Sequence, residues 1–157
     1  MKKIVSFVIA LLIVCSLIAC RGTIMPALTA EQIVEALKSS GMPITNVVVF
    51  DEKTDPNGLL GRPNQYTSKV NFSDPAHEDA DIKSPDNTVE VFKFADDARK
   101  RANVIRDVTG ATPALAEYVY QESFYVLRLN HDILPADAAK YEELFKVICS
   151  SSERPTE

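Results

Sequence analysis

"NTVEVFKFADDARKRANVIRDVT", residues 87–109, joins a segment typical of a strand directly to a segment typical of a helix. Residues 87–94 are rich in β-branched and aromatic side chains, which favour an extended conformation. Asp96 and Asp97 suit the positive N-terminus of a helix, and each has a basic residue four positions later, Lys100 or Arg101. The stretch therefore predicts a strand over 87–94 and a helix over 96–109, which ends at Gly110 and buries Ala98, Ala102, Ile105 and Val108.

Upstream of this stretch the sequence predicts one helix and two strands. Thr29 and Gln32 have the spacing of a capping box, and an apolar face of Ile33, Val34 and Leu37 follows before Gly41 ends the helix. Residues 44–50, ITNVVVF, are apolar and β-branched over four consecutive positions, which predicts a central strand covered on at least one face. A second strand is expected over 65–72.

Downstream, residues 117–130 are rich in Tyr, Val, Phe and Leu. They form either two strands that break near Gln121 and Glu122 or one long strand with a bulge, because no strong turn sequence interrupts them. Pro135 suits the first turn of a last helix. Its predicted buried face consists of Ala138, Tyr141, Leu144, Phe145 and Ile148.

The order of these elements predicts the fold class. Strands in succession with helices inserted at intervals indicate a single α+β domain, with a mostly antiparallel sheet of four to five strands. About three helices pack against this sheet, and we expect them on one face. A ferredoxin-like core is one arrangement compatible with this order.

The N-terminus has the charge pattern of a secretory signal, with Lys2 and Lys3 before an apolar run over 4–19. As a helix this run would cover only ~24 Å, which is short for a hydrocarbon core of ~30 Å. The pattern predicts that the segment is removed rather than kept as a membrane span.

Leu17-Ile18-Ala19-Cys20 resembles the lipobox of bacterial lipoproteins, in which a Leu, a variable residue and a small residue precede a Cys. The resemblance implies that the Cys20 thiol carries fatty acyl chains such as palmitate, that the peptide is cut before Cys20, and that the membrane holds the protein there. The alternatives are an ordinary signal with a coincidental Cys20, or an uncleaved anchor. We expect a signal peptide over 1–19, a lipidated tether over 20–28, a domain over 29–149 and a loose tail over 150–157.

Charge and cysteine content restrict the partners. The net charge of −5, which becomes more negative once Lys2 and Lys3 are removed, disfavours nucleic acid as a partner. If Cys15 leaves with the signal and Cys20 is acylated, no second thiol is left for an intramolecular disulfide with Cys149. Because Cys149 ends an apolar helical face, we expect it to be a small buried side chain.

The stretch "LLGRPNQYTSKV", residues 59–70, supplies the candidate binding site within the long segment 51–86. Gly61 and Pro63 shape a loop whose polar side chains could hold a carboxylate, a sugar or a peptide. The candidate residues are Arg62, Asn64, Gln65, Tyr66 and Lys69.

An alternative interpretation of the same stretch is structural. Leu59 and Leu60 would then fill the core, Arg62 would pair with Asp51 or Asp55, and the polar residues would lie along an edge strand. Residues 66 and 69 would point to opposite faces of a regular strand, so both can contact one ligand only if a bulge intervenes.

We identify no catalytic residue, cofactor or metal site in the sequence. Hydrolase, zinc and phosphate-loop motifs are missing from it. His131 beside Asp132 is expected at the surface, because adjacent residues rarely form one catalytic group. An acidic segment has oxygen ligands suited to calcium, but its spacing matches no calcium loop, and its residues are Asp74, His77, Glu78, Asp79 and Asp81.

The segments 59–70, 87–102 and 125–145 are similar to those of a group of small exported bacterial lipoproteins for which we assign no activity. This resemblance implies lipoprotein status and a shared fold only. We expect a membrane-anchored binding or interaction module on the extracytoplasmic face of the cell envelope, which contacts an envelope protein, a wall component or a small ligand. An extracytoplasmic enzyme or enzyme inhibitor, and a phage or plasmid exclusion lipoprotein, are the alternatives.

Overall fold

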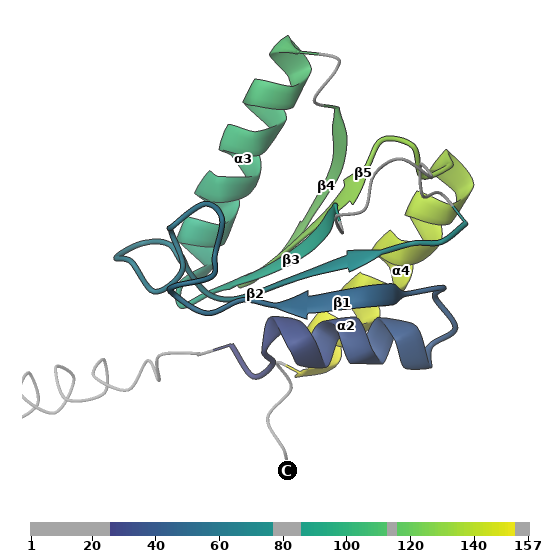
Figure 1. Cartoon of the computed structure of the whole chain (residues 1–157), viewed down its shortest axis with the longest axis horizontal. Coiled ribbons are helices and arrows are strands. Elements are labelled where there is room, and N and C mark those ends of the chain that lie inside the picture. The colour runs from purple at the N-terminus through teal and green to yellow at the C-terminus, as the bar shows by residue number, and fades with distance from the viewer. Residues whose placement is uncertain (1–25, 77–85, 113–115, 153–157) are drawn as a thin grey trace, which may run out of the picture.

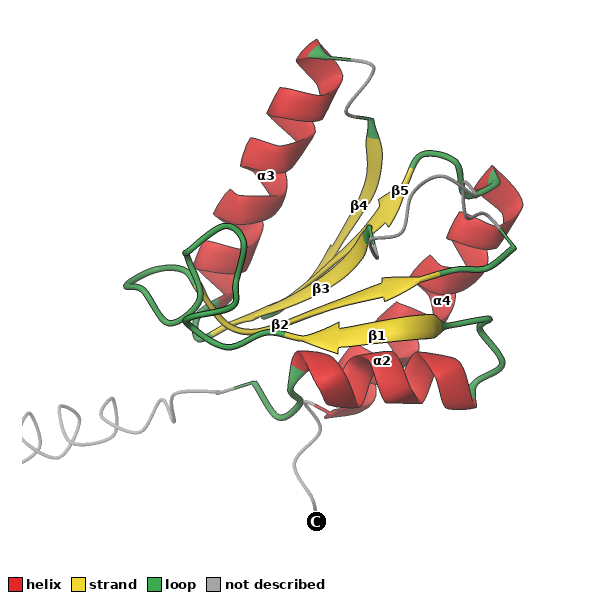
Figure 2. Cartoon of the chain, in the orientation of Figure 1, coloured by secondary structure: helices red, strands yellow, loops and turns green. Residues whose placement is uncertain are grey.

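The computed structural model describes residues 26–76, 86–112 and 116–152 of the chain (Figure 1). These residues form one α+β domain of three helices and a five-stranded sheet, which confirms the predicted fold class (Figure 2). The elements are α2 (Ala30–Ser39), β1 (Thr45–Val49), β2 (Tyr66–Ser73), β3 (Asn87–Phe92), α3 (Ala95–Ala111), β4 (Glu117–Glu122), β5 (Tyr125–Asn130) and α4 (Pro135–Ser152).

The strands lie in the order β1-β2-β3-β5-β4, and each neighbouring pair is antiparallel. Because β3 and β4 are both antiparallel to β5, they run parallel to each other, and α3 connects them across β5. This is one split β-α-β unit, whereas a ferredoxin-like domain is built from two. The first three strands instead follow one another as hairpins, so the ferredoxin-like arrangement is wrong for this chain.

Helices cover both faces of the sheet, which corrects the expectation of helices on one face. Figure 1 shows α2 and α4 on one side of the sheet and α3 on the other. The physical reason lies in β3, which is buried at all six positions. Successive side chains of a strand point to opposite faces, so a fully buried strand needs cover on both.

Two apolar clusters correspond to these two faces. The larger lies beneath α2 and α4 and includes Phe72, Leu127 and Phe145. Cys149 belongs to it and is fully buried, as its position in the helix predicted. The smaller lies beneath α3 and consists of Tyr66, Phe92, Ala98, Ala102 and Val126.

The predicted central strand is an edge strand. β1 pairs only with β2 among the described strands, and Val47 and Val49 are 40% and 51% exposed. A run of β-branched residues favours the extended backbone but does not say how many neighbours the strand has. A positive φ of 46° at Asn46 and a register shift between Thr45 and Val48 make this edge irregular, which limits pairing with other strands.

The predicted helix ends require two corrections. α3 continues through Gly110 to Ala111, and Val108 is 51% exposed rather than buried. α4 extends to Ser152, so residues 150–152 of the predicted tail are helical, and 153–157 lie outside the described residues. The hydroxyls of Ser150, Ser151 and Ser152 donate to the carbonyls of Lys146, Ile148 and Cys149 in the last turns of the helix.

The segment 117–130 forms two strands, β4 and β5. They pair from Glu117 opposite Asn130 to Glu122 opposite Tyr125. The turn between them contains Ser123 with a positive φ of 45°. The break lies at Ser123 and Phe124, two residues beyond the predicted position.

The N-terminal part of the described chain is hydrogen-bonded to Tyr125, and its Leu28 packs against the larger apolar cluster. The backbone N–H groups of Ala27 and Leu28 donate to the Tyr125 hydroxyl at 3.1 and 3.4 Å, and this hydroxyl also lies 3.4 Å from Ser152 Oγ. Residues 27 and 28 of the predicted tether are therefore docked on the domain. The predicted signal peptide and Cys20 lie outside the described residues. Among the helices described, we find none with the length and hydropathy needed to cross a bilayer.

Candidate functional site

The loop between β1 and β2, residues 50–65, is organised by the carboxylate of Asp55. This carboxylate accepts hydrogen bonds from the backbone N–H groups of Leu59 and Leu60 at 2.9 and 3.1 Å. It also accepts the Tyr66 hydroxyl at 2.7 Å and Lys69 Nζ at 2.7 Å. Leu59 and Leu60, in the middle of the loop, pack against the cluster beneath α3. The loop is therefore fixed at its middle as well as at its two ends, which continue into β1 and β2.

Tyr66 and Lys69 lie in the interior, with exposed fractions of 0% and 3%. A register irregularity between Tyr66 and Ser68 brings both side chains to the face where Asp55 lies, as a bulge was expected to do. Lys69 Nζ also lies 4.9 Å from the centre of the Phe50 ring, a cation–π contact. The polar atoms of these two residues therefore form hydrogen bonds within the loop instead of facing solvent.

The pKa values reflect this burial. Burial by itself would raise the pKa of the Asp55 carboxyl, but the hydrogen bonds from Lys69, Tyr66, Leu59 and Leu60 hold that pKa far below its ordinary value. Burial and the hydrogen bond to Asp55 raise the pKa of Tyr66 well above its ordinary value. Asp55 is therefore charged and Tyr66 is neutral over the whole physiological range.

Arg62 is exposed and forms no ion pair with any other residue that the structure describes. The expected pairing of Arg62 with Asp51 or Asp55 is wrong, because other groups use both carboxylates. Lys69 holds Asp55, and the exposed Asp51 accepts the hydroxyl and amide of Thr54.

A second group of charges lies beside the first and was not expected from the sequence. Glu90 is fully buried on β3 and accepts two hydrogen bonds from Arg101 of α3, both at 3.0 Å. Arg128 of β5 lies 3.6 Å from Glu90 and donates two hydrogen bonds of 2.7 Å to Glu117 of β4. Burial by itself would lower the pKa of Arg128, but Glu117 and Glu90 raise it. The four residues thus link α3 to three strands.

This group also corrects the predicted ion pairs of α3. Arg101 turns inward to Glu90 instead of pairing with Asp97. Asp97 pairs with Lys100, and Asp96 pairs with Arg99, both at a spacing of three residues. The sequence signal that was missed is the charge inside "TVEVF", since an acidic residue between buried valines needs a basic partner.

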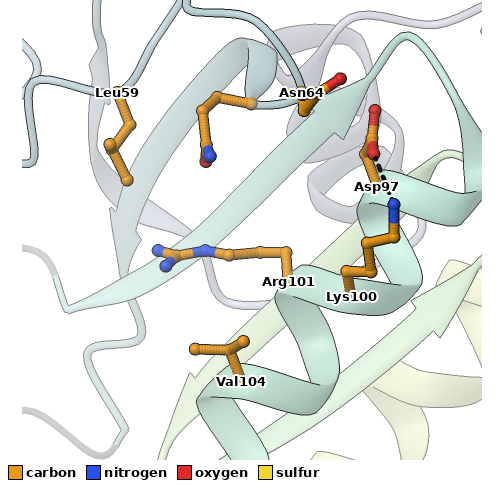
Figure 3. Close-up of a pocket in the computed structure, with 7 residues that line it drawn as sticks. Leu59, Asn64, Asp97, Lys100, Arg101 and Val104 are labelled. Atoms are coloured by element: carbon orange, nitrogen blue, oxygen red, sulfur yellow. Dashed lines mark hydrogen bonds and ion pairs between the residues drawn. The ribbon is translucent and has the colours of Figure 1, made fainter.

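A groove lies between the loop 50–65 and α3, with a volume of about 420 Å³. Figure 3 shows the Arg101 side chain extending from α3 across this groove toward Leu59, above Val104. The residues that line it are Leu59, Asn64, Gln65, Asp97, Lys100, Arg101 and Val104.

A second depression, of about 310 Å³, continues along α3 toward its C-terminus and shares Arg101 and Val104 with the first. We call the two together the α3 groove. Its second half is lined by those two residues and by Asn57, Ile105, Val108, Thr109, Glu117 and Arg128.

The loop backbone presents Asn64 to this groove. Gly61 and Asn64 have positive φ values of 79° and 61°, and the Gly61 N–H donates to the Tyr66 carbonyl at 2.9 Å. Glycine and asparagine tolerate this left-handed conformation better than other residues. The tight turn therefore folds back before β2 and leaves the side chains of Asn64 and Gln65 at the rim of the groove.

The structure thus divides the five candidate residues into three sets. Asn64 and Gln65 line the α3 groove, Tyr66 and Lys69 support its loop from the interior, and Arg62 is exposed outside the residues that line it. Arg101 and Arg128 were missed, because a basic residue in a helix or strand pattern ordinarily indicates a solvated face.

Of the acidic segment and His131, the structure describes Asp74 and His131. Asp74 is buried and accepts the Tyr141 hydroxyl at 3.0 Å, while the other acidic-segment candidates lie outside the described residues. Within the described ranges no cluster of three His, Cys, Asp or Glu side chains is arranged to hold a metal ion. His131 is exposed and lies 3.2 Å from its neighbour Asp132, at the surface as expected.

Comparisons of the chain with protein-family models, with curated proteins and with solved structures gave no significant match.

Proposed function

We propose that this protein is a lipid-anchored binding module on the extracytoplasmic face of a bacterial envelope, and that it holds its partner in the α3 groove. The observation that carries this proposal is a groove with fixed polar groups and two exposed valines. Val104 and Val108 are 56% and 51% exposed, one helical turn apart, beside the guanidinium of Arg101. Exposed apolar side chains rimmed by polar groups are typical of binding sites.

The rigidity of the groove supports recognition of a defined partner. Arg101 is held by Glu90 and lies 6.0 Å from the centre of the Tyr66 ring. Asp55 fixes the loop that carries Asn64 and Gln65. A site whose groups are already in place loses little conformational entropy on binding.

The anchor in this proposal is Cys20, on the basis of the Leu17-Ile18-Ala19-Cys20 sequence. Two or three acyl chains give stable membrane attachment at ~0.8 kcal/mol per buried CH₂. Between Cys20 and the docked N–H of Ala27, an extended chain reaches only ~25 Å. The module would therefore act on partners close to the membrane surface.

The anchor is tested by Cys20→Ser. We expect this variant to lose labelling by a radioactive fatty acid and to stay uncleaved, because the acylated thiol is the substrate for processing. Labelling of the Ser variant at the wild-type level would reject the anchor.

The binding role is tested by crosslinking in intact cells. A photo-reactive phenylalanine derivative replaces Lys100 of α3, which lines the groove and is 74% exposed, and in a matched control it replaces Val147, which is 62% exposed on α4. We expect one defined product from position 100 that Val104→Asp abolishes. Equal products from positions 100 and 147, or none from position 100, would reject the groove as the binding site.

A further inference from the structure

The charges that line the α3 groove compensate one another, which restricts the chemistry of its ligand. Lys100 lies 3.5 Å from Asp97, Arg101 lies 3.0 Å from Glu90, and Arg128 lies 2.7 Å from Glu117. Each basic group therefore has an acidic partner. An ionic ligand would gain no net attraction here and would have to compete with these pairs.

Hydrogen-bond donors nevertheless remain for a neutral ligand. Arg101 uses Nε and Nη2 for Glu90, and its Nη1 group has no hydrogen-bond partner in the described part of the chain. The side-chain amides of Asn64 and Gln65 line the same half of the groove. Guanidinium and amide N–H groups suit neutral oxygen acceptors such as the carbonyl groups of a peptide backbone.

The apolar groups of the groove have the spacing of an extended peptide. Val104 and Val108 are four residues apart on a helix, a separation of ~6 Å. Alternate side chains on one face of an extended chain are ~6.6 to 6.8 Å apart. From Asp97 to Thr109 the helix rises ~18 Å, which is the length of five to six extended residues.

Aliphatic contacts favour a peptide over a sugar. The residues lining the α3 groove that the structure describes include Leu59, Val104, Ile105 and Val108, and none of them is aromatic. The C–H faces of sugar rings are recognised chiefly by flat aromatic rings. Aliphatic side chains of a peptide pack well against valine and leucine instead.

We infer that the α3 groove binds an uncharged, extended peptide segment whose alternate aliphatic side chains pack on Val104 and Val108. Its backbone carbonyl oxygens accept hydrogen bonds from Arg101 Nη1 and from the amides of Asn64 and Gln65. This inference rests on the proposed function, since it names the class of partner for the same groove.

The test uses the full-length protein in detergent and capped hexapeptides that alternate Val or Leu with Ser, Asn or Gln. Matched series carry one Lys or one Glu at a polar position. We expect the uncharged series to bind more tightly than both charged series, as measured by fluorescence polarisation. Equal or tighter binding of a charged series, or no binding of the uncharged series at about 1 mM, would overturn the inference.

Three variants locate the binding. Val104→Asp, which introduces an unpaired charge beside the peptide, is expected to raise Kd about tenfold or more. Arg101→Lys keeps a positive charge near Glu90 but removes the guanidinium fork, so a rise in Kd of several-fold is expected. Val147→Asp on α4 is the matched control and should leave Kd unchanged. Thermal unfolding of each variant shows whether it remains folded, and peptide binding unaffected by a folded Val104→Asp variant would overturn the inference.

A neutral oligosaccharide, chitotetraose, separates this inference from the proposed function. We expect no binding of chitotetraose. If it binds in a manner sensitive to Val104→Asp, the peptide class is wrong and the binding module stands. If no peptide binds and the crosslink from position 100 in cells also fails, the proposed function falls with the inference.

Discussion

The face of the sheet beneath α2 and α4 is filled by aliphatic and aromatic side chains, whereas the face beneath α3 combines a smaller apolar cluster with buried charges. Phe72, Leu127 and Phe145 are representative of the first face. On the second face, Lys69 and Glu90 occupy directly paired positions of β2 and β3, and each is bound to an opposite charge.

This difference indicates that one face mainly stabilises the fold, whereas the other mainly fixes the positions of particular side chains. Apolar burial is favourable whatever the orientation of the groups, so the α2 and α4 face contributes most of the hydrophobic stabilisation. Buried ion pairs contribute little net stability compared with apolar side chains of the same size, but their hydrogen bonds fix directions. On the α3 face these directions position Arg101 and the loop at the groove.

The largest expected effect comes from removing a charge on the α3 face. Asp55→Ala leaves Lys69 buried without its partner and removes the acceptor of two backbone N–H groups. We expect the free energy of unfolding to fall by ~3 to 5 kcal/mol, measured by urea denaturation. Asp96→Ala, at an exposed ion pair, is the control and should change little. A loss of unfolding free energy as small as that of the control would show that the Lys69 ammonium group is solvated in the Asp55→Ala variant.

The opposite face is tested by Leu127→Ala, since Leu127 is fully buried beneath α2 and α4. We expect a loss of ~2 to 5 kcal/mol from the lost burial and the cavity. Because no charge is involved, the loss should be the same at acidic and neutral pH. A loss that depends strongly on pH would contradict the conclusion that apolar burial, rather than charge, stabilises this face.

The third test compares the acid sensitivity of wild type and Asp55→Asn. The pKa of Asp55 is lowered in the folded state, so its contribution is present above the unfolded pKa of about 3.9 and is lost as the pH falls from there toward the folded value. The difference in unfolding free energy between the two proteins should therefore be largest above about pH 5 and shrink below about pH 4. A constant difference across this range would exclude Asp55 as the source of acid sensitivity.

The smallest effect is expected at the solvent-facing end of the ionic group. Glu117→Gln keeps an oxygen acceptor for Arg128, and both side chains are partly exposed, 24% and 19%. We expect a loss of about 1 kcal/mol in urea denaturation. A loss as large as that of Asp55→Ala would mean that the two groups of charges act as one buried network.

Local sequence signals predicted the elements well where the signal and its partner are close in the chain. The Thr29 capping box is present as expected, with hydrogen bonds of 2.8 and 3.3 Å between Thr29 and Gln32. The β-branched and aromatic residues of 87–94 and the apolar positions of α3 likewise predicted the strand and the helix at the centre of the domain.

Position within the sheet could not be predicted in the same way, because it depends on contacts between distant segments. Val47 and Val49 have the composition of a central strand but lie at an edge that α3 does not cover. For the same reason, only the part of the site that lies within one loop could be predicted from the sequence. Asn64 and Gln65 follow from loop chemistry, whereas Glu90 and Arg101 meet only when α3 folds back across the sheet.

The single hydroxyl of Tyr125 joins the two ends of the domain, since it contacts the N–H of Ala27 and the last helical residue, Ser152. Both ends therefore leave from the face that carries α2 and α4, opposite α3 (Figure 1). If Cys20 carries acyl chains, as we propose, that face of the domain would be the one nearer the bilayer. The α3 groove would then open away from the bilayer, and a reporter attached at Ser152, the last described residue, would start from the face opposite the groove.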